Sequence, residues 1–295
     1  MSERLIQLSS NPTLLDYCAG AAARFIRPVA QFLAPNVPVP VPTGFFKLWT
    51  EKVRFSLPDT AREVGGHATK IDIEASNSRY NCSPQSLDFP IDRATGGDLE
   101  TLAKDGLDLV LDVANQVHEL SVITKALSAL VTSESLSWGP AADPIVDIDT
   151  RILKLIKQSK CGQIGVLFGA SAWDWFKNHP KVVAKAKHDL SWENSPGLFH
   201  AQAKYLTAYS VRDLNADGLQ EHIAFMLDGS VIIFARSDTP TRRDPSFMKT
   251  FRLSDNIFRG LYDNAERRIT SVACDWTEDV QISNTVGAIR LDLQI

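Results

Sequence analysis

Residues 98–130 read DLETLAKDGLDLVLDVANQVHELSVITKALSAL and contain no proline. Apolar residues recur in this stretch at steps of three, four and seven, which is the spacing of an amphipathic helix. They are Leu99, Leu102, Leu109, Val113, Val117, Leu120, Ile123, Leu127 and Leu130. At about 1.5 Å per residue the helix would be roughly 50 Å long. Because such a helix needs contacts along its whole length, the sequence predicts a subunit that is stabilised by its neighbours.

The segment before this helix is predicted to be extended. Pro38, Pro40 and Pro42 alternate with valine, and each proline fixes φ and removes a backbone donor, which excludes a central strand. We expect polyproline II or an edge strand, serving as a strut between two structural parts. An alanine-rich stretch, residues 13–26, predicts a short helix further upstream.

Residues 45–74 predict a two-stranded ribbon. Residues 45–49 and 53–57 form the expected outgoing arm, and residues 70–74 alternate between polar and apolar side chains as the return arm. Pro58 and a Gly65–Gly66 pair predict a turn-rich tip. A two-stranded ribbon is marginally stable alone in water. We therefore expect it to lie across another subunit.

Composition is typical of a soluble protein. The chain has 295 residues, 44% of them hydrophobic, and a net charge of −4, which argues against tight neutralisation of nucleic-acid phosphates. Cys18, Cys82, Cys161 and Cys274 show no C-x-x-C spacing, which favours reduced thiols. No apolar run approaches the ~20 residues of a membrane span, and no secretory signal is seen. We expect a cytoplasm-like environment and no membrane partner.

Downstream of the long helix, helices and strands alternate, and the whole chain reads as α+β. A breaker segment, 135–143, is followed by predicted helices and strands and then by a β meander. The predicted helices are 145–157, 171–178 and 181–187, and the predicted strands are 163–168, 205–211, 223–227 and 231–235. The meander would comprise residues 269–272, 280–282 and 288–293.

Catalytic templates fail on inspection. His118 and Glu119 begin a zinc-protease motif, but Val122 occupies the position of its second histidine. Ser171 lacks the second glycine of a nucleophile elbow and is expected to cap the helix that it precedes. His179, His188 and His200 are spaced irregularly, which favours packing or polar roles. The sequence predicts no catalytic, cofactor-binding or metal-binding residue, and no cofactor.

Two acidic groups have structural interpretations. Asp213 to Gly218 matches the first half of a calcium loop, but position 12 would be Ala224 instead of glutamate. A surface turn is the favoured reading, with a cation site at Asp213–Asp217 left open. Asp143, Asp147 and Asp149 surround a predicted helix start, where negative charge complements the helix dipole.

The order of these segments resembles that of the major capsid proteins of tailed bacteriophages, which have the Hong Kong 97 fold. The resemblance is carried by the strut at 35–42 with GFFKLW at 44–49, by the charged arm that leads to FPID at 89–92, and by the long helix. Trp138, then DPIVDID at 143–149 and VLFGASAWDWFKNHPK at 166–181, complete it.

The resemblance implies a division into four parts. Residues 1–43 would form an N-terminal arm, and 44–92 an extended β-hairpin loop over a neighbouring subunit. Residues 93–142 and 262–295 would form a peripheral domain with the long spine helix, and 143–261 an axial domain. Copies would assemble as pentamers and hexamers into an icosahedral shell that encloses double-stranded phage DNA. The resemblance thus implies a structural protein, not an enzyme, built into the virion after assembly in the cytoplasm of the bacterial host.

Further partners also follow from the resemblance. A portal protein is implied, and scaffolding would come from a separate protein or be dispensable, because the chain starts almost directly in the arm; a decoration protein stays open. Some relatives cross-link a loop lysine to a neighbour's asparagine, and Lys47, Lys52 and Lys70 lie in the loop here, but no partner asparagine is assigned. The alternatives are an encapsulin-type nanocompartment shell and, more distantly, an α/β hydrolase-like enzyme.

Overall fold

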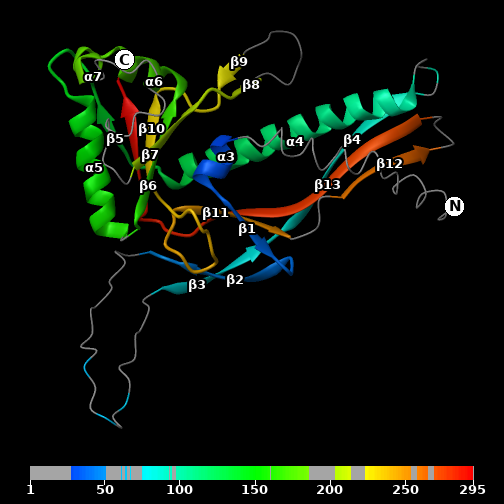
Figure 1. Ribbon diagram of the computed structural model, residues 1–295, viewed down its shortest axis with the longest axis horizontal. Coiled ribbons are helices and arrows are strands. Elements are labelled where there is room, and N and C mark those ends of the chain that lie inside the picture. The colour runs from blue at the N-terminus through cyan, green and yellow to red at the C-terminus, as the bar shows by residue number, and fades with distance from the viewer. Residues whose placement is uncertain are drawn as a thin grey trace.

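The predicted long helix is α4, Leu99–Ala129, which has 31 residues. It begins at Asp98, whose side chain accepts hydrogen bonds from the backbone amides of Glu100 and Thr101. In a computed structural model, α4 runs along most of the length of the molecule (Figure 1). The structure describes residues 28–50, 61, 64, 67, 75–92, 94, 98–159, 161–185, 203–213, 223–253, 258–264 and 269–294.

One side of α4 packs on a five-stranded sheet, here called the peripheral sheet. Its strands are β1 (Asn36–Val39), β4 (Ser83–Asp92), β11 (Met248–Leu253), β12 (Phe258–Asn264) and β13 (Ile269–Ile282). β13 is the central strand and pairs antiparallel with β4, β11 and β12. β1 pairs parallel with β11 at the edge of the sheet, which confirms the edge-strand interpretation of the proline segment.

A second sheet, the axial sheet, has the strand order β5-β14-β10-β6-β7. These strands are β5 (Ser133–Leu136), β14 (Ala288–Leu293), β10 (Ser230–Arg236), β6 (Gln163–Gly169) and β7 (Ala203–Ala208). The helices that accompany it are α5 (Pro144–Ser159), α6 (Ala170–Asn178) and α7 (Pro180–Lys185). Ile148, Ile152, Phe168 and Phe176 are fully buried in the core between these helices and the sheet.

A further apolar cluster joins the two sheets. The short helix α3, Pro28–Leu33, packs on α4, and Leu33, Val122 and Ile123 belong to one apolar cluster. Leu167 and Phe234 of the axial sheet and Met248 of the peripheral sheet belong to the same cluster. The helix therefore connects both sheets through one continuous core.

Two small ribbons complete the described chain. β2 (Thr43–Leu48) pairs antiparallel with β3 (Ser76–Asn81), and β8 (Val211–Asp213) pairs antiparallel with β9 (Ile223–Phe225). The β2–β3 pair is the stem of the predicted loop hairpin. Its second strand, β3, begins at Ser76, after the return arm expected at 70–74, which lies outside the described residues.

Several strands pair across the bounds that were expected for the parts of the chain. β4 belongs to the peripheral sheet and not to the loop, since it pairs with β13 over residues 83–92. β11 lies in the peripheral sheet, although 143–261 was expected to be axial, and β14 lies in the axial sheet. The C-terminal strands are therefore no meander: β13 is one strand of 14 residues, and β14 pairs with β10 and β5.

Some expectations fall outside the described residues. They are the helix at 13–26, the second part of the outgoing arm at 53–57, the return arm at 70–74, Cys18, His188, His200, loop residues Lys52 and Lys70, and the turn at 214–218. After that turn, β9 lies within the strand expected at 223–227, whereas the strand expected at 205–211 is divided between β7 and β8.

Candidate assembly surfaces

The β2–β3 stem is fixed firmly to the peripheral sheet. The Tyr80 ring stacks on Phe251 with centroids 4.7 Å apart, and Phe46 packs on Phe251 at 5.1 Å. Gly44 lies opposite Tyr80, and a Cβ at Gly44 would come within 2.4 Å of the Tyr80 hydroxyl oxygen. Glycine at this position therefore lets the tyrosine ring lie against the backbone of β2.

Backbone hydrogen bonds at Trp49 hold the end of the stem. The Trp49 amide donates to the carbonyl of Ser283 at 2.8 Å, and the Trp49 carbonyl accepts from the Thr285 amide at 2.9 Å. These bonds tie the outgoing chain to the turn between β13 and β14. Trp49, the last residue before the loop, is thus held by two backbone hydrogen bonds.

The other side of the stem exposes an aromatic side chain. Phe45 is 56% exposed, and the Arg79 guanidinium lies over its ring, 5.1 Å from the centroid. A cation over an exposed aromatic ring contributes about 0.5 to 1 kcal/mol. The stem therefore presents a pre-formed aromatic and cationic surface.

The outer face of α4 carries an apolar row. Leu109, Val113 and Val117 succeed one another at four-residue steps and are exposed. The face that contacts the sheet consists instead of Ala103, Leu107, Val110, Leu111 and Ala114. The predicted stripe was thus wrong in the middle of the helix, where its residues form the outer surface.

The neighbouring side chains of His118 and Glu119 connect α4 to β13 and to the segment before β8, respectively. His118 Nδ1 lies 2.9 Å from Glu278 Oε1 in β13, and Arg252 Nε donates to Glu278 Oε2 at 3.1 Å. Burial alone would raise the pKa of Glu278, but the hydrogen bond and charge of His118 and the charge of Arg252 outweigh it and lower the pKa to about 2. Glu119, fully buried, accepts a hydrogen bond from Ser210, which precedes β8.

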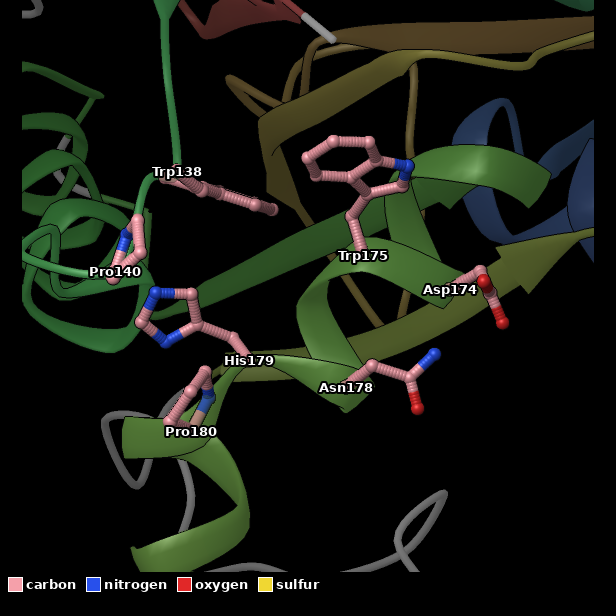
Figure 2. Close-up of a pocket in the computed structure, with 7 residues that line it drawn as sticks. All are labelled: Trp138, Pro140, Asp174, Trp175, Asn178, His179 and Pro180. Atoms are coloured by element: carbon pink, nitrogen blue, oxygen red, sulfur yellow. The ribbon is translucent and has the colours of Figure 1, made fainter.

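A pocket of about 260 Å³ opens between α6, α7 and the segment after β5. Trp138 and Pro140 come from the segment after β5, and Trp175, His179 and Pro180 come from α6, α7 and the residue between them (Figure 2). Trp138 is buried, whereas Trp175 is 41% exposed. The walls of the pocket are therefore mainly aromatic and apolar.

The His179 and Asp174 side chains of this pocket are already engaged, whereas the Trp138 indole nitrogen has no hydrogen-bond partner among the described residues. His179 Nε2 lies 3.1 Å from the Gly139 carbonyl oxygen, and His179 Nδ1 accepts a hydrogen bond from the Lys181 amide at 3.3 Å. Asp174 pairs with Lys177 at 2.8 Å. Because both ring nitrogens of His179 hold the backbone, the arrangement suits binding of apolar side chains better than proton transfer.

Ser171 does not cap α6 with its side chain. The helix begins after Gly169, and the Asp228 carboxylate from the loop before β10 accepts a hydrogen bond from the Ser171 amide at 3.1 Å. The Asp228 carbonyl also accepts from the Ala172 amide. The cap was missed because it comes from a residue 57 positions away in sequence.

The remaining sequence candidates lie in the core and at a helix start. Cys82, Cys161 and Cys274 are buried, and the Asp143 carboxylate accepts a hydrogen bond from the Val146 amide at the start of α5. In the described part of the chain, no group of three or more His, Cys, Asp or Glu side chains is arranged to hold a metal ion. Among these residues, no helix is both long and apolar enough to cross a membrane.

Sequence reasoning missed the pocket and the outer row of α4. The pocket combines residues from two segments, 138–140 and 174–180, and only their tryptophans and prolines hinted at a shared surface. The residues of the outer row were noticed but assigned to the wrong face, because both faces of α4 are apolar near its middle.

Comparison with known proteins identifies the fold. No protein-family model matches the sequence, and no curated protein matches it. The structure resembles a phage-related protein from Bordetella bronchiseptica RB50 with a TM-score of 0.71 at 15% identity, over 93% of this chain and 95% of that chain. It resembles the capsid protein of cyanophage P-SCSP1u with a TM-score of 0.54 at 10% identity, over 90% and 87%. For the mature capsid of bacteriophage PhiM1 the TM-score is 0.54 at 8% identity, over 90% and 86%.

These likenesses define the class of fold, which is that of viral shell subunits. More particularly, the α+β fold of this chain is that of phage capsid proteins, the Hong Kong 97-like fold. The fold predicted from the sequence is confirmed.

Proposed function

We propose that this chain is the major capsid protein of a tailed bacteriophage. Its copies would assemble through pentamers and hexamers into an icosahedral shell around double-stranded DNA in the cytoplasm of the host cell. The observation that carries the proposal is the likeness to phage capsid structures over nine-tenths of the chain. The role is structural, not enzymatic.

The exposed surfaces support such an assembly. Phe45 on the hairpin stem and the Leu109–Val113–Val117 row of α4 are apolar and accessible in the single chain. We propose that neighbouring copies cover both, with the loop after β2 extending over an adjacent subunit. The net charge of −4 suits a shell that contacts packaged DNA without binding it tightly. Portal, scaffolding and decoration proteins would be the further partners.

Expression of the chain alone, followed by negative-stain electron microscopy, tests the proposal. We expect rings of capsomer size or closed shells. Protein that is monodisperse at 32.6 kDa over the whole accessible concentration range would oppose it.

A further inference from the structure

The outer face of the β2–β3 stem combines an aromatic ring with positive charge. Side chains alternate along a strand, so Phe45 and Lys47 of β2 lie on the face opposite to the buried Phe46. Arg79 of β3 pairs with Phe45 across the ribbon and is exposed on the same face. Among the described residues, neither Lys47 nor Arg79 has an ion-pair partner. The stem thus presents an apolar centre between two cations.

The outer face of α4 has the opposite charge. Asp105 is exposed and lies one helical turn before Leu109, and Asp112 lies nearly one turn after it, on the same face. Residues 98–117 contain five acidic side chains and one lysine. Asp112 accepts a hydrogen bond from the side-chain amide of Gln116, whereas Asp105 has no ion-pair partner in the described part of the chain. Leu109 is therefore an apolar centre beside an exposed carboxylate.

These two surfaces lie on opposite faces of the peripheral sheet. Glu278 and Asp279 are consecutive residues of β13, so their side chains point to opposite faces. Glu278 contacts His118 of α4, and Asp279 accepts a hydrogen bond from the Asn81 amide of the stem at 2.7 Å. In Figure 1, α4 and the stem accordingly lie on opposite sides of β13. Within one chain the two surfaces therefore do not meet, and only a second copy can bring them together.

Charge favours one contact between copies over the alternatives. Two α4 helices facing each other would bring carboxylates together, and two stems would bring Lys47 and Arg79 against their equivalents; like charges that meet across an interface are costly. Contact between a stem and the α4 of the next copy brings Asp105 to these cations instead. The same contact covers Phe45 and Leu109. Because its two patches differ, the contact is heterologous, and its repetition forms a ring where the rotation closes.

We infer that the stem of one copy lies on the outer face of α4 of the next copy, with Phe45 over Leu109 and with Lys47 and Arg79 beside Asp105. The inference rests on the proposed shell function, to which it adds which surface covers which within a ring.

Zero-length cross-linking tests this contact in the unaltered, assembled protein. A water-soluble carbodiimide joins a lysine amine to a carboxylate that it touches. We expect peptide mass spectrometry of the linked dimer to show Lys47 joined to Asp105 or Asp112. Because the stem and the outer face of α4 lie on opposite faces of the sheet, such a link must join two copies.

Lys47→Arg is the matched control for the cross-link, because it keeps the charge and removes the reactive amine. This variant should assemble as the unaltered chain does and lose the link. Particles in which carbodiimide joins copies through other residues, with no link from Lys47 to α4, would overturn the inference.

A charge exchange provides a second test. Asp105→Lys and Arg79→Glu should each raise the protein concentration needed for assembly by about tenfold, and the double variant should restore it to within about threefold. Arg212→Glu changes another exposed arginine on a two-stranded ribbon. Combined with Asp105→Lys in place of Arg79→Glu, it should restore nothing. Additive losses in the Asp105–Arg79 double variant would contradict the pairing.

The two tests separate this contact from the proposed function. If particles form but neither the cross-link nor the restoration appears, the contact is wrong while the shell function stands. If the unaltered chain never assembles, the shell function falls and the contact falls with it.

Discussion

The ring of Tyr80 lies over the ring of Phe251 with an interplanar angle of 21°, and this stack joins the hairpin stem to the peripheral sheet. Both side chains are buried. Because Tyr80 lies on β3 and Phe251 on β11, this aromatic pair acts together with Phe46 and the Trp49 backbone to fix the stem on the sheet. Assembly and stability should therefore both depend on it.

Replacement of Tyr80 by alanine should lower the free energy of unfolding by about 3 to 5 kcal/mol, as for other large aromatic side chains removed from a core. Tyr80→Phe is the matched control. Among the described residues the Tyr80 hydroxyl has no hydrogen-bond partner, so its removal should cost less than about 1 kcal/mol. Urea unfolding followed by tryptophan fluorescence measures both. Equal losses in the two variants would show that the hydroxyl, and not the ring, anchors the stem.

The start of α6 should depend on Asp228 and not on Ser171. Asp228→Ala removes the side-chain acceptor of the Ser171 amide and should cost about 1 kcal/mol in thermal or urea unfolding. Ser171→Ala should change the stability by less than about 0.5 kcal/mol. If Ser171→Ala lowers the free energy of unfolding more than Asp228→Ala does, Ser171 caps the helix, as the sequence predicted.

Acid should weaken the junction between α4 and β13. The pKa of Glu278 falls from 4.5 to about 2 in the folded protein, so its ionised form stabilises the fold. This stabilisation is complete above pH 4.5 and is lost progressively as the pH falls toward 2; it amounts to about 3 kcal/mol. Unfolding free energies measured across this pH range should decrease in the unaltered chain.

In Glu278→Gln, the decrease over the same pH range should be smaller by that amount. Glu100→Gln is the control, because Glu100 is an exposed carboxylate on α4 whose partner is Lys104 one turn away. The change in the pH profile should be larger for Glu278→Gln than for this control. Identical profiles for Glu278→Gln and the unaltered chain would exclude Glu278 as the acid-sensitive group.

Native thiols should react slowly. Burial, followed by the nearby negative charges of Asp279 and Glu278, raises the pKa of the Cys82 thiol to about 11, and burial with Asp244 raises that of Cys161 to about 11. The reactive thiolate is therefore scarce at pH 8. Alkylation by iodoacetamide, quantified by peptide mass spectrometry, should be at least about tenfold slower at both residues in the folded than in the urea-unfolded chain. Equal rates would contradict the buried placement.

The outer row of α4 should contribute to assembly without contributing to the stability of the single chain. Val113→Asp introduces a charge that a neighbouring copy would bury, so particle yield should fall by about tenfold or more while the melting temperature is unchanged. Val131→Asp alters another exposed valine, 82% exposed and just beyond the helix, and should leave the yield intact. A normal yield for Val113→Asp, measured by sedimentation, would remove this face from the interface.

The extent of α4 could be predicted from sequence because its signals are local. An acidic cap at Asp98 and the lack of proline determine where it begins and how far it continues. Which face it buries is not local. Ala103, Gly106 and Ala114 line the buried face, and a Cβ at Gly106 would come within 2.6 Å of the Phe89 ring. Small residues on this face leave room for the side chains of the strands. A search for large apolar residues therefore selected the outer row of α4 as the buried face.

The C-terminal strands show a second limit of local patterns. Asp275, Glu278 and Asp279 interrupt the apolar pattern, which suggested separate strands, yet β13 runs through them as one strand. Glu278 can be buried because His118 and Arg252 supply its partners from distant segments. The sheet in which β14 pairs is likewise decided by β10 and β5, and no feature within β14 itself specifies that choice.

The pocket was not predictable from either of its two segments. Trp138 and the segment from Asp174 to Pro180 lie far apart in sequence and meet only because α6 and the chain after β5 flank the same sheet. The hydrogen bonds that the two ring nitrogens of His179 make could likewise not be predicted from the sequence, because one partner, Gly139, lies in the distant segment.

The most direct test of the capsid proposal is the size and symmetry of the purified protein, measured by cryo-electron microscopy of the unaltered chain. The account predicts rings of five or six copies or closed icosahedral shells, with α4 and the β2–β3 stem at contacts between copies. Density for isolated 32.6 kDa subunits alone, at every protein concentration that can be reached, would contradict it.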